Sequence, residues 1–350
     1  MTRKDYGVFL PNAAGGWMIS STAPYPPADY DYNRQVALAA DGYGLDFVMA
    51  MSKWLGFGGA TDHWGETIDS LSLIAALAEA TTHVGVWGTI HCNVQHPAFA
   101  AKIFTTLQQI SHGRGGMNIV NGSYADEFRQ MGLWNDSMSH ADRYRMTEAW
   151  MTAVDRLWTE PEVTMKTDFF VLDRCQSRPH PVTRPTVVSA GRSALGRKFQ
   201  AKYADAAFLG SDSMAEMREF ARDVHDQAAA HGRTCGTYAM LTLVIGETDA
   251  AAERAAAAYA QGIDRVALAN MRSSWGWAQE KALSWAEDAP GDEAFQTPYI
   301  TGSPTTIAER VHRVLDGAEL DGIMLIFPDY LRDLPVFGTE VLPLLRAADG

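Results

Sequence analysis

Cysteine is scarce in this 350-residue sequence, and patterns typical of metal sites are missing. Cys92, Cys175 and Cys235 lie far apart, so neither a disulfide framework nor a paired-cysteine metal site is encoded, and we expect free thiols. His91 and His96 flank Cys92 closely, but on an extended connection this spacing fixes no ligand geometry, and no carboxylate adjoins it. We therefore predict no metal site.

Long apolar runs and an excess of positive charge are also absent. No stretch approaches the roughly 20 apolar residues needed to cross a bilayer, and the first residues contain no signal-peptide core, so we expect a cytoplasmic protein without a membrane segment. The 42 acidic and 29 basic side chains give a net charge of -13, which repels nucleic-acid phosphates and anionic lipids. Nucleic acids and membrane surfaces are disfavoured as partners.

The common nucleotide-binding and hydrolase motifs are missing as well. The sequence contains no P-loop, no GxSxG nucleophile elbow and no HExxH zinc motif. Two glycine clusters, at residues 56–59 and 113–116, lack the strand-to-helix placement of a dinucleotide-binding fingerprint. Motifs alone therefore leave the chemistry open.

The sequence does contain eight short apolar runs that indicate buried strands. They cover residues 6–10, 46–51, 84–90, 116–120, 186–190, 206–209, 238–245 and 322–327. Continuous apolar runs are typical of parallel strands covered on both faces, and helical patterns lie between these runs. Without a linker to divide the chain, this alternation predicts one domain over residues 1–350, an α/β protein with a single (β/α)8 TIM barrel.

Two connections are too long for simple loops, and both are predicted to be insertions at the mouth of the barrel. Residues 121–141 follow the fourth strand, and residues 248–304, an inserted helical segment, follow the seventh. The second connection contains Trp275, Trp277 and Trp285, for which packing within the insertion is a simpler interpretation than substrate contact.

Several stretches resemble the bacterial luciferase-like flavin monooxygenases. They are Val8 to Asn12 with Gly16 and Trp17, Leu45 to Phe47, Lys53, Gly56 to Gly59, His96 to Ala98, Ser111 to Arg114, Met117 to Val120, Glu127 and Phe128, Arg143 and Tyr144, Ala190 to Ser193, and Phe337 to Leu344. The chain is most similar to the branch that contains the pyrimidine monooxygenase of uracil breakdown and the dimethylsulfone monooxygenases.

The resemblance implies reduced FMN at the C-terminal mouth of the barrel, with its phosphate on a helix N-terminus. Gly191, Arg192 and Ser193 stand where backbone N–H groups and the helix dipole favour an anion. Arg143 and Tyr144 match the family's contacts near the phosphate and ribityl chain. A surface salt bridge is the alternative for Arg143.

The family's polar contacts to the isoalloxazine ring match four residues of this chain, Ser52, Lys53, Asn118 and Glu127. They would hydrogen-bond the pyrimidine edge of the ring and hold the negative charge that develops there. For Asn118, a satisfied core asparagine is the alternative.

The resemblance also implies an oxygen pocket. Thr89 and Asn118 would steady an anionic flavin peroxide as catalytic residues, with Met49 and Met51 as its apolar wall. Attachment of oxygen at flavin N5 or at C4a stays open, and an ordinary strand residue is the alternative for Thr89.

The chain departs from these relatives at positions that are expected to lie near the substrate. Asn121 to Tyr124 replace a Ser/Thr-Gly-Trp sequence, so we expect a pocket that is wider or that hydrogen-bonds differently. His91 and Gln95 replace more apolar residues and could donate to a heteroaromatic ring or a carbonyl oxygen. A catalytic His91 with a near-neutral pKa could also act as a general acid.

These implications predict a two-component monooxygenase that uses FMNH2 and O2, with an NAD(P)H:flavin reductase as its partner. The expected reaction is oxygenation, with ring opening, of a small N-heterocycle or cyclic amide through a flavin peroxide. Oxygenation of an organosulfur compound, a non-catalytic flavin-binding role and a deazaflavin cofactor stay open. The apolar helix at residues 69–80 predicts a homodimer.

Overall fold

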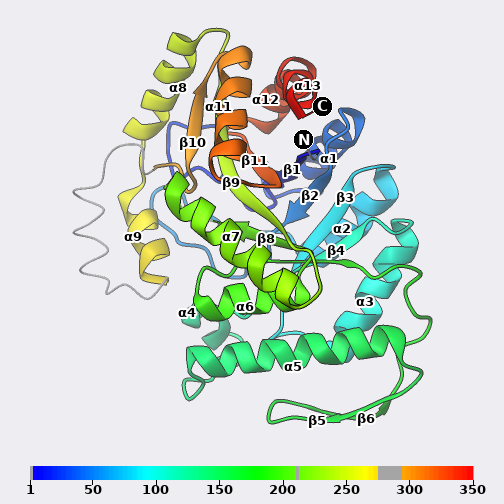
Figure 1. Ribbon diagram of the computed structural model, residues 1–350. Coiled ribbons are helices and arrows are strands. Elements are labelled where there is room, and N and C mark those ends of the chain that lie inside the picture. The colour runs from blue at the N-terminus through cyan, green and yellow to red at the C-terminus, as the bar shows by residue number, and fades with distance from the viewer. Residues whose placement is uncertain (1–2, 210–212, 275–293, 350) are drawn as a thin grey trace.

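Eight parallel strands form a closed barrel in the computed structural model, which describes residues 3–209, 213–274 and 294–349 (Figure 1). The barrel strands are β1 (Asp5–Phe9), β2 (Phe47–Ala50), β3 (Gly85–His91), β4 (Gly115–Val120), β7 (Thr186–Ser189), β8 (Ala206–Leu209), β9 (Gly236–Ile245) and β11 (Gly322–Ile326). Each strand pairs in parallel with the next in this order, and β11 returns to β1. The predicted (β/α)8 barrel is confirmed.

Helices alternate with the strands and cover the outside of the barrel. They are α1 (Tyr30–Gly42), α2 (Ser70–Ala80), α3 (Pro97–Ile110), α4 (Ala125–Arg129), α5 (His140–Thr159), α6 (Ala194–Tyr203), α7 (Met214–Ala230), α8 (Asp249–Gln261), α9 (Arg265–Ser274), α11 (Pro304–Gly317), α12 (Tyr330–Val336), the π-helical turn η2 (Phe337–Val341) and α13 (Leu342–Asp349). None of the helices in the described ranges is both long and apolar enough to cross a membrane.

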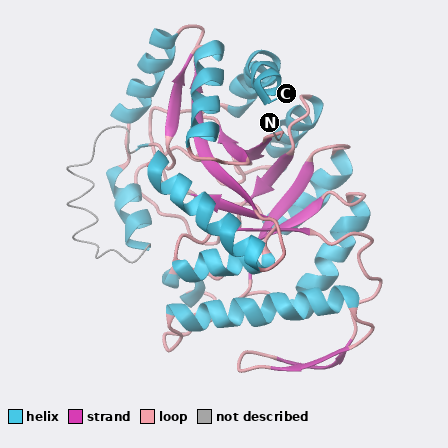
Figure 2. Ribbon diagram, viewed as in Figure 1, coloured by secondary structure: helices cyan, strands magenta, loops and turns pink. Residues whose placement is uncertain are grey.

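Some elements were not predicted from the apolar runs. The antiparallel hairpin of β5 (Val163–Lys166) and β6 (Val171–Cys175) lies outside the barrel, beside α5 (Figure 2). Its strands are partly exposed, so they lack the continuous apolar run of a barrel strand. A further strand, β10 (Tyr299–Gly302), lies in the long connection that follows β9 and pairs with β9. Trp275, Trp277 and Trp285 lie outside the described residues.

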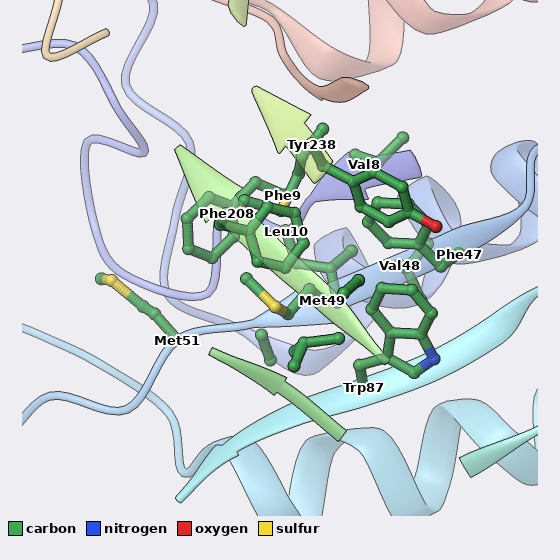
Figure 3. Close-up of a cluster of buried hydrophobic side chains, with 14 of the residues drawn as sticks. Val8, Phe9, Leu10, Phe47, Val48, Met49, Met51, Trp87, Phe208 and Tyr238 are labelled. Atoms are coloured by element: carbon green, nitrogen blue, oxygen red, sulfur yellow. The ribbon is translucent and has the colours of Figure 1, made fainter. Parts of the chain in front are cut away.

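Aromatic side chains fill the N-terminal half of the barrel (Figure 3). The ring of Phe47 stacks on Trp87 at 4.1 Å between centroids and faces Tyr238 at 5.6 Å. Glycines on neighbouring strands make room for these rings: a Cβ would lie 2.3 Å from the Phe47 ring at Gly7 and 2.5 Å from the Trp87 ring at Gly116. Because these rings fill this half in the described part of the chain, space for a ligand is expected at the C-terminal mouth of the barrel.

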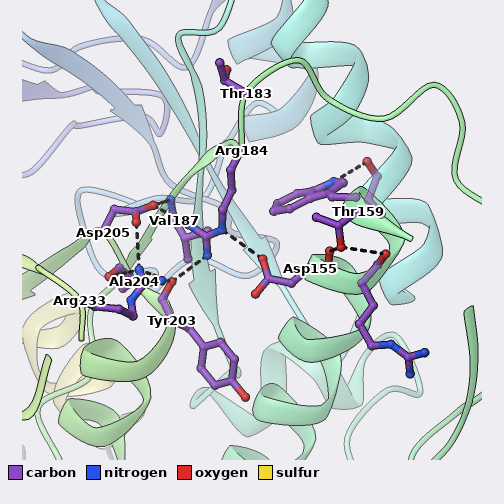
Figure 4. A network of polar contacts seen from close by, with 12 residues as sticks. Asp155, Thr159, Thr183, Arg184, Val187, Tyr203, Ala204, Asp205 and Arg233 are labelled. Carbon is purple, nitrogen blue, oxygen red and sulfur yellow. Dashed lines mark hydrogen bonds and ion pairs between the residues drawn. The ribbon is translucent and has the colours of Figure 1, made fainter. Parts of the chain in front are cut away.

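A polar network ties the β7 region to the surrounding helices (Figure 4). The Arg184 guanidinium donates to the carboxylate of Asp155 on α5, to that of Asp205 and to the carbonyl of Tyr203 at the end of α6. Asp205 also accepts from the backbone N–H of Val187 on β7 at 2.8 Å. These contacts hold β7, α5 and α6 together, and the ends of those elements carry part of the site described next.

Candidate active site

A cavity of about 490 Å3 opens among the C-terminal ends of the strands, within the range of about 300–1,000 Å3 common for ligand pockets. Its wall includes Met51, Ser52, Lys53, Thr89, His91, Asn118, Glu127, Arg143, Tyr144, Gly191, Arg192 and Ser193. All the predicted site residues except Met49 and Gln95 therefore meet at one cavity. They come from connections far apart in the sequence, because the carboxyl ends of parallel strands converge at one face of a barrel.

Met49 lies one layer deeper than the cavity. Side chains two residues apart on a strand point to the same side, so Met49 and Met51 both face the barrel interior. Met51 lies at the mouth and lines the cavity, whereas Met49 is 2% exposed within the core (Figure 3). Of the two methionines expected to wall an oxygen pocket, the structure places only Met51 on the cavity wall.

Thr89 and Asn118 form a directed hydrogen-bond chain across β3 and β4, where they are paired in register. The Thr89 hydroxyl lies 2.8 Å from the carbonyl oxygen of Ala50, which can only accept, so the hydroxyl donates to it. Asn118 Nδ2 in turn donates to Thr89 Oγ1 at 3.0 Å. The other amide atom, Asn118 Oδ1, is buried and has no partner among the described residues.

The hydrogen bonds from Asn118 to Thr89 and from Thr89 to Ala50 correct the role expected for Thr89. Its single proton is engaged by the Ala50 carbonyl, so in this arrangement the hydroxyl is not a free donor toward oxygen. Instead, Thr89 determines which atom Asn118 presents to a ligand, and that atom is an acceptor.

Lys53 and Glu127 form a buried ion pair on the cavity wall. Lys53 Nζ lies 3.1 Å from Glu127 Oε1, and the two side chains are 9% and 3% exposed. Burial lowers the pKa of Lys53, and the Glu127 charge partly opposes that shift. The same carboxylate oxygen accepts from the backbone N–H of Trp54 at 2.8 Å. Lys53 Nζ also lies 4.4 Å from the ring centroid of Tyr124, in the stretch that departs from the relatives.

His91 is buried and electrically neutral at pH 7. Its Nε2 lies 3.4 Å from the carbonyl oxygen of Ser52, and because a carbonyl oxygen only accepts, this contact favours the tautomer with the proton on Nε2. The ring packs against Trp54 and Phe128, with centroids 5.2 and 5.1 Å away. Burial lowers its pKa to about 4. The expectation of a near-neutral pKa is therefore wrong, because the pocket removes the water that would stabilise the imidazolium, and His91 is poorly suited to act as a general acid.

The loop after β7 forms an anion cradle at the start of α6. Ser193 caps the helix, and its Oγ accepts from the backbone N–H of Gly196 at 3.1 Å. A Cβ at Gly191 would lie 2.7 Å from Tyr144 Oη and 2.9 Å from Gly196 Cα, so only glycine lets the backbone pass this closely. Free N–H groups in the first turn of α6 and the helix dipole favour a negatively charged ligand here.

Arg143 completes the positive side of the cavity. Its Nη1 donates to the carbonyl of Met138 at 3.1 Å, and its Cζ lies 5.4 Å from the ring centroid of Trp134. The Nε atom is buried without a hydrogen-bond partner, and no described carboxylate forms a salt bridge with Arg143. The alternative of a surface salt bridge thus finds no support in this part of the chain, and the guanidinium can bind an anionic ligand.

The cavity also contains residues that the sequence analysis missed. His140 and Thr147 line it from α5, three residues before and four residues after Arg143. Helical spacing places such positions on one face, so Arg143 and Tyr144 could have predicted both. Trp64 lines the cavity from a loop in which it has a φ of 59°, a conformation that no sequence pattern signalled.

Cys92 and His96, considered as metal ligands, and Gln95, considered as a substrate contact, each have protein partners. Cys92 Sγ lies 3.3 Å from Thr147 Oγ1, and His96 caps α3 by accepting from the backbone N–H of Ala98. The described residues contain no cluster of three or more His, Cys, Asp or Glu side chains able to hold a metal. Gln95 is absent from the cavity wall, and its backbone carbonyl accepts from Trp150.

The sequence matches a family described as luciferase-like monooxygenase over residues 5–319. The chain belongs to this family. A pyrimidine monooxygenase RutA of Methylorubrum extorquens (strain PA1) is 32% identical over 351 residues, which cover 98% of this chain and 94% of the relative. The predicted membership and enzyme class are confirmed: the protein is a flavin-dependent monooxygenase.

Solved structures of other proteins share the fold. Riboflavin lyase RcaE, solved with modified FMN and riboflavin, has a TM-score of 0.84 at 20% identity, covering 99% of this chain and 92% of its own. DmoA from Hyphomicrobium sulfonivorans has a TM-score of 0.84 at 19% identity, covering 99% and 89%. An F420-dependent secondary alcohol dehydrogenase has a TM-score of 0.77 at 17% identity, covering 98% and 99%. The fold therefore accommodates both flavin and deazaflavin proteins.

Proposed function

We propose that this protein is the oxygenating component of a two-component system in which an NAD(P)H:flavin reductase supplies reduced FMN. The proposed substrate is a small N-heterocycle or cyclic amide whose ring is opened. One observation carries the proposal: an anion cradle at α6 and the polar residues at the ends of β2, β3 and β4 share a single cavity.

The chemistry of this cavity fits FMN. Gly191, Ser193 and Arg143 would hold the phosphate, because close backbone approach, a helix N-terminus and an unpaired guanidinium nitrogen meet there. At the other end, the unpartnered Asn118 Oδ1 would accept from an N–H group of the flavin ring, beside the apolar Met51. When bound, reduced FMN supplies the electrons that activate O2.

The assembly and location follow the same reasoning. We propose a homodimer that uses the outer side of α2, where Ala75 and Ala76 are partly exposed small residues that permit close helix contact. We also propose a cytoplasmic location, where reduced nicotinamide cofactors sustain the reductase. Sedimentation at micromolar concentration tests the dimer, and a strictly monomeric species contradicts it.

The activity is tested by reconstitution. The purified protein is mixed with FMN, NADPH and a flavin reductase under 18O2, and products from N-heterocycles, cyclic amides and dimethyl sulfone are analysed by mass spectrometry. We expect 18O in a ring-opened product that depends on FMN. Activity with reduced F420 in place of FMN, or oxygenation of the sulfone alone, would contradict the proposal.

A further inference from the structure

The end of β2 determines the hydrogen-bonding character of the cavity wall. The backbone carbonyl of Ala50, at the end of β2, contacts the Thr89 hydroxyl on β3. The carbonyl of Ser52, two residues further along, contacts the His91 ring, which is two residues further along β3. Because a carbonyl oxygen only accepts, each of these side chains must donate to it. The donors of these two β3 side chains are thereby engaged inside the protein.

Beside these engaged donors, β3 and β4 leave two acceptors for a ligand. Asn118 Oδ1 is one, since its amide nitrogen donates to Thr89, and His91 Nδ1 is the other, since the ring proton is on Nε2. Both atoms are buried without a partner among the described residues. A buried acceptor without a donor is unfavourable, so a ligand that brings N–H groups is favoured here. The proposed position of FMN accounts for Asn118 and leaves His91 Nδ1 without a role.

We propose that His91 is a specificity-determining residue whose Nδ1 accepts a hydrogen bond from an N–H group of the substrate. The inference rests on the proposed function, and it reverses the donor role expected from the sequence. The residue is only 7% exposed, and its imidazole packs between the rings of Trp54 and Phe128. The acceptor is therefore preorganised before the substrate arrives.

This acceptor distinguishes two substrate classes. A cyclic amide, imide or ureide has ring N–H groups and can satisfy Nδ1. Sulfone and sulfonate oxygens are acceptors only, so an organosulfur substrate would bury Nδ1 without a partner. A site that hydrogen-bonds a substrate group strongly rejects an analogue lacking it. The wall thus selects a heterocycle with an N–H group.

Matched pairs of probes test the role of His91. Uracil is compared with 1,3-dimethyluracil, and glutarimide with N-methylglutarimide, by calorimetric binding to the FMN-loaded protein and by kcat/KM under reductase-coupled turnover. We expect the N–H compound to be preferred at least about 10-fold by the wild type. His91→Phe should reduce that preference to within about threefold while FMN affinity is unchanged.

A control variant makes the same substitution outside the cavity. The His83 side chain is 81% exposed at the start of the β3 region, so His83→Phe should keep the full preference for N–H compounds. Equal acceptance of the N-methyl compounds by the wild type, or an unchanged preference in His91→Phe, would overturn the inference.

A spectroscopic measurement does not depend on turnover or on the folding of a variant. The 15N resonances of the His91 ring should report a neutral Nε2–H tautomer between pH 6 and pH 8, and the probe with an N–H group should shift the Nδ1 resonance. An Nδ1–H tautomer would overturn the inference. Absence of oxygenation for every compound would instead defeat the proposed function, whereas oxygenation that ignores His91 defeats only this inference.

Discussion

Removal of the Thr89 hydroxyl tests the hydrogen-bond chain at the centre of the site. Thr89→Val keeps the volume and the branched shape of the side chain, which suits its strand. It deletes the donor to the Ala50 carbonyl and the acceptor for Asn118 Nδ2. The Asn118 amide is then free to rotate and to present its nitrogen to the cavity.

The size of the effect follows from these two contacts. Two hydrogen bonds of about 0.5–1.5 kcal/mol each predict a loss of about 1–3 kcal/mol in the free energy of unfolding. With Asn118 at the proposed flavin site, a misplaced polar group there predicts a fall of about 10²-fold in coupled oxygenation. FMN should still bind, because the α6 cradle and Arg143 are untouched.

The assay measures thermal unfolding, FMN affinity by fluorescence quenching, and oxygenated product per NADPH consumed. Thr89→Ser retains the hydroxyl and should recover most of the coupled turnover. Thr105→Val is the matched control, since that hydroxyl donates to the Ala101 carbonyl at 2.8 Å within α3 and does not line the cavity. Full coupled oxygenation in Thr89→Val would show that Thr89 only packs in its strand and would refute the reasoning.

Three further predictions concern the anion cradle and acid stability. Arg143→Ala should weaken FMN binding by roughly 10- to 150-fold through loss of a charge-assisted contact of about 1.5–3 kcal/mol. Arg145→Ala, at a side chain that is 63% exposed, should leave FMN binding unchanged. Equal FMN affinities for the two variants would exclude Arg143 from the phosphate site. Gly191→Ala should weaken FMN binding because its Cβ meets the cradle, whereas at Gly42 a Cβ meets nothing within 4 Å, so Gly42→Ala should retain the wild-type dissociation constant. Burial lowers the pKa of His91 from 6.5 to about 4, so the unfolded chain binds the extra proton first and stability should fall by about 3 kcal/mol as the pH drops from 6.5 to 4. A melting temperature that depends on pH equally in wild type and His91→Phe would contradict that assignment.

The sequence by itself determined the barrel and the approximate place of the site. Apolar runs such as Val86 to Ile90 predict barrel strands because a strand buried on both faces needs continuous apolar residues, a property each strand carries locally. The helix-start pattern at Gly191 to Ser193 is equally local, and the structure places it on the cavity wall. Ser139 and Asp142 form a capping box that begins α5 at His140, which is a local signal of the same kind.

Only the tertiary structure decided what the site residues can donate or accept. Thr89 and His91 look like donors in the sequence, but the carbonyls of Ala50 at the end of β2 and of Ser52 just after it engage their protons. The low pKa of His91 likewise depends on Trp54 and Phe128, which reach it from other connections. Hydrogen-bond direction and burial depend on what lies across from a residue, and residues distant in the sequence supply those neighbours only when the barrel closes.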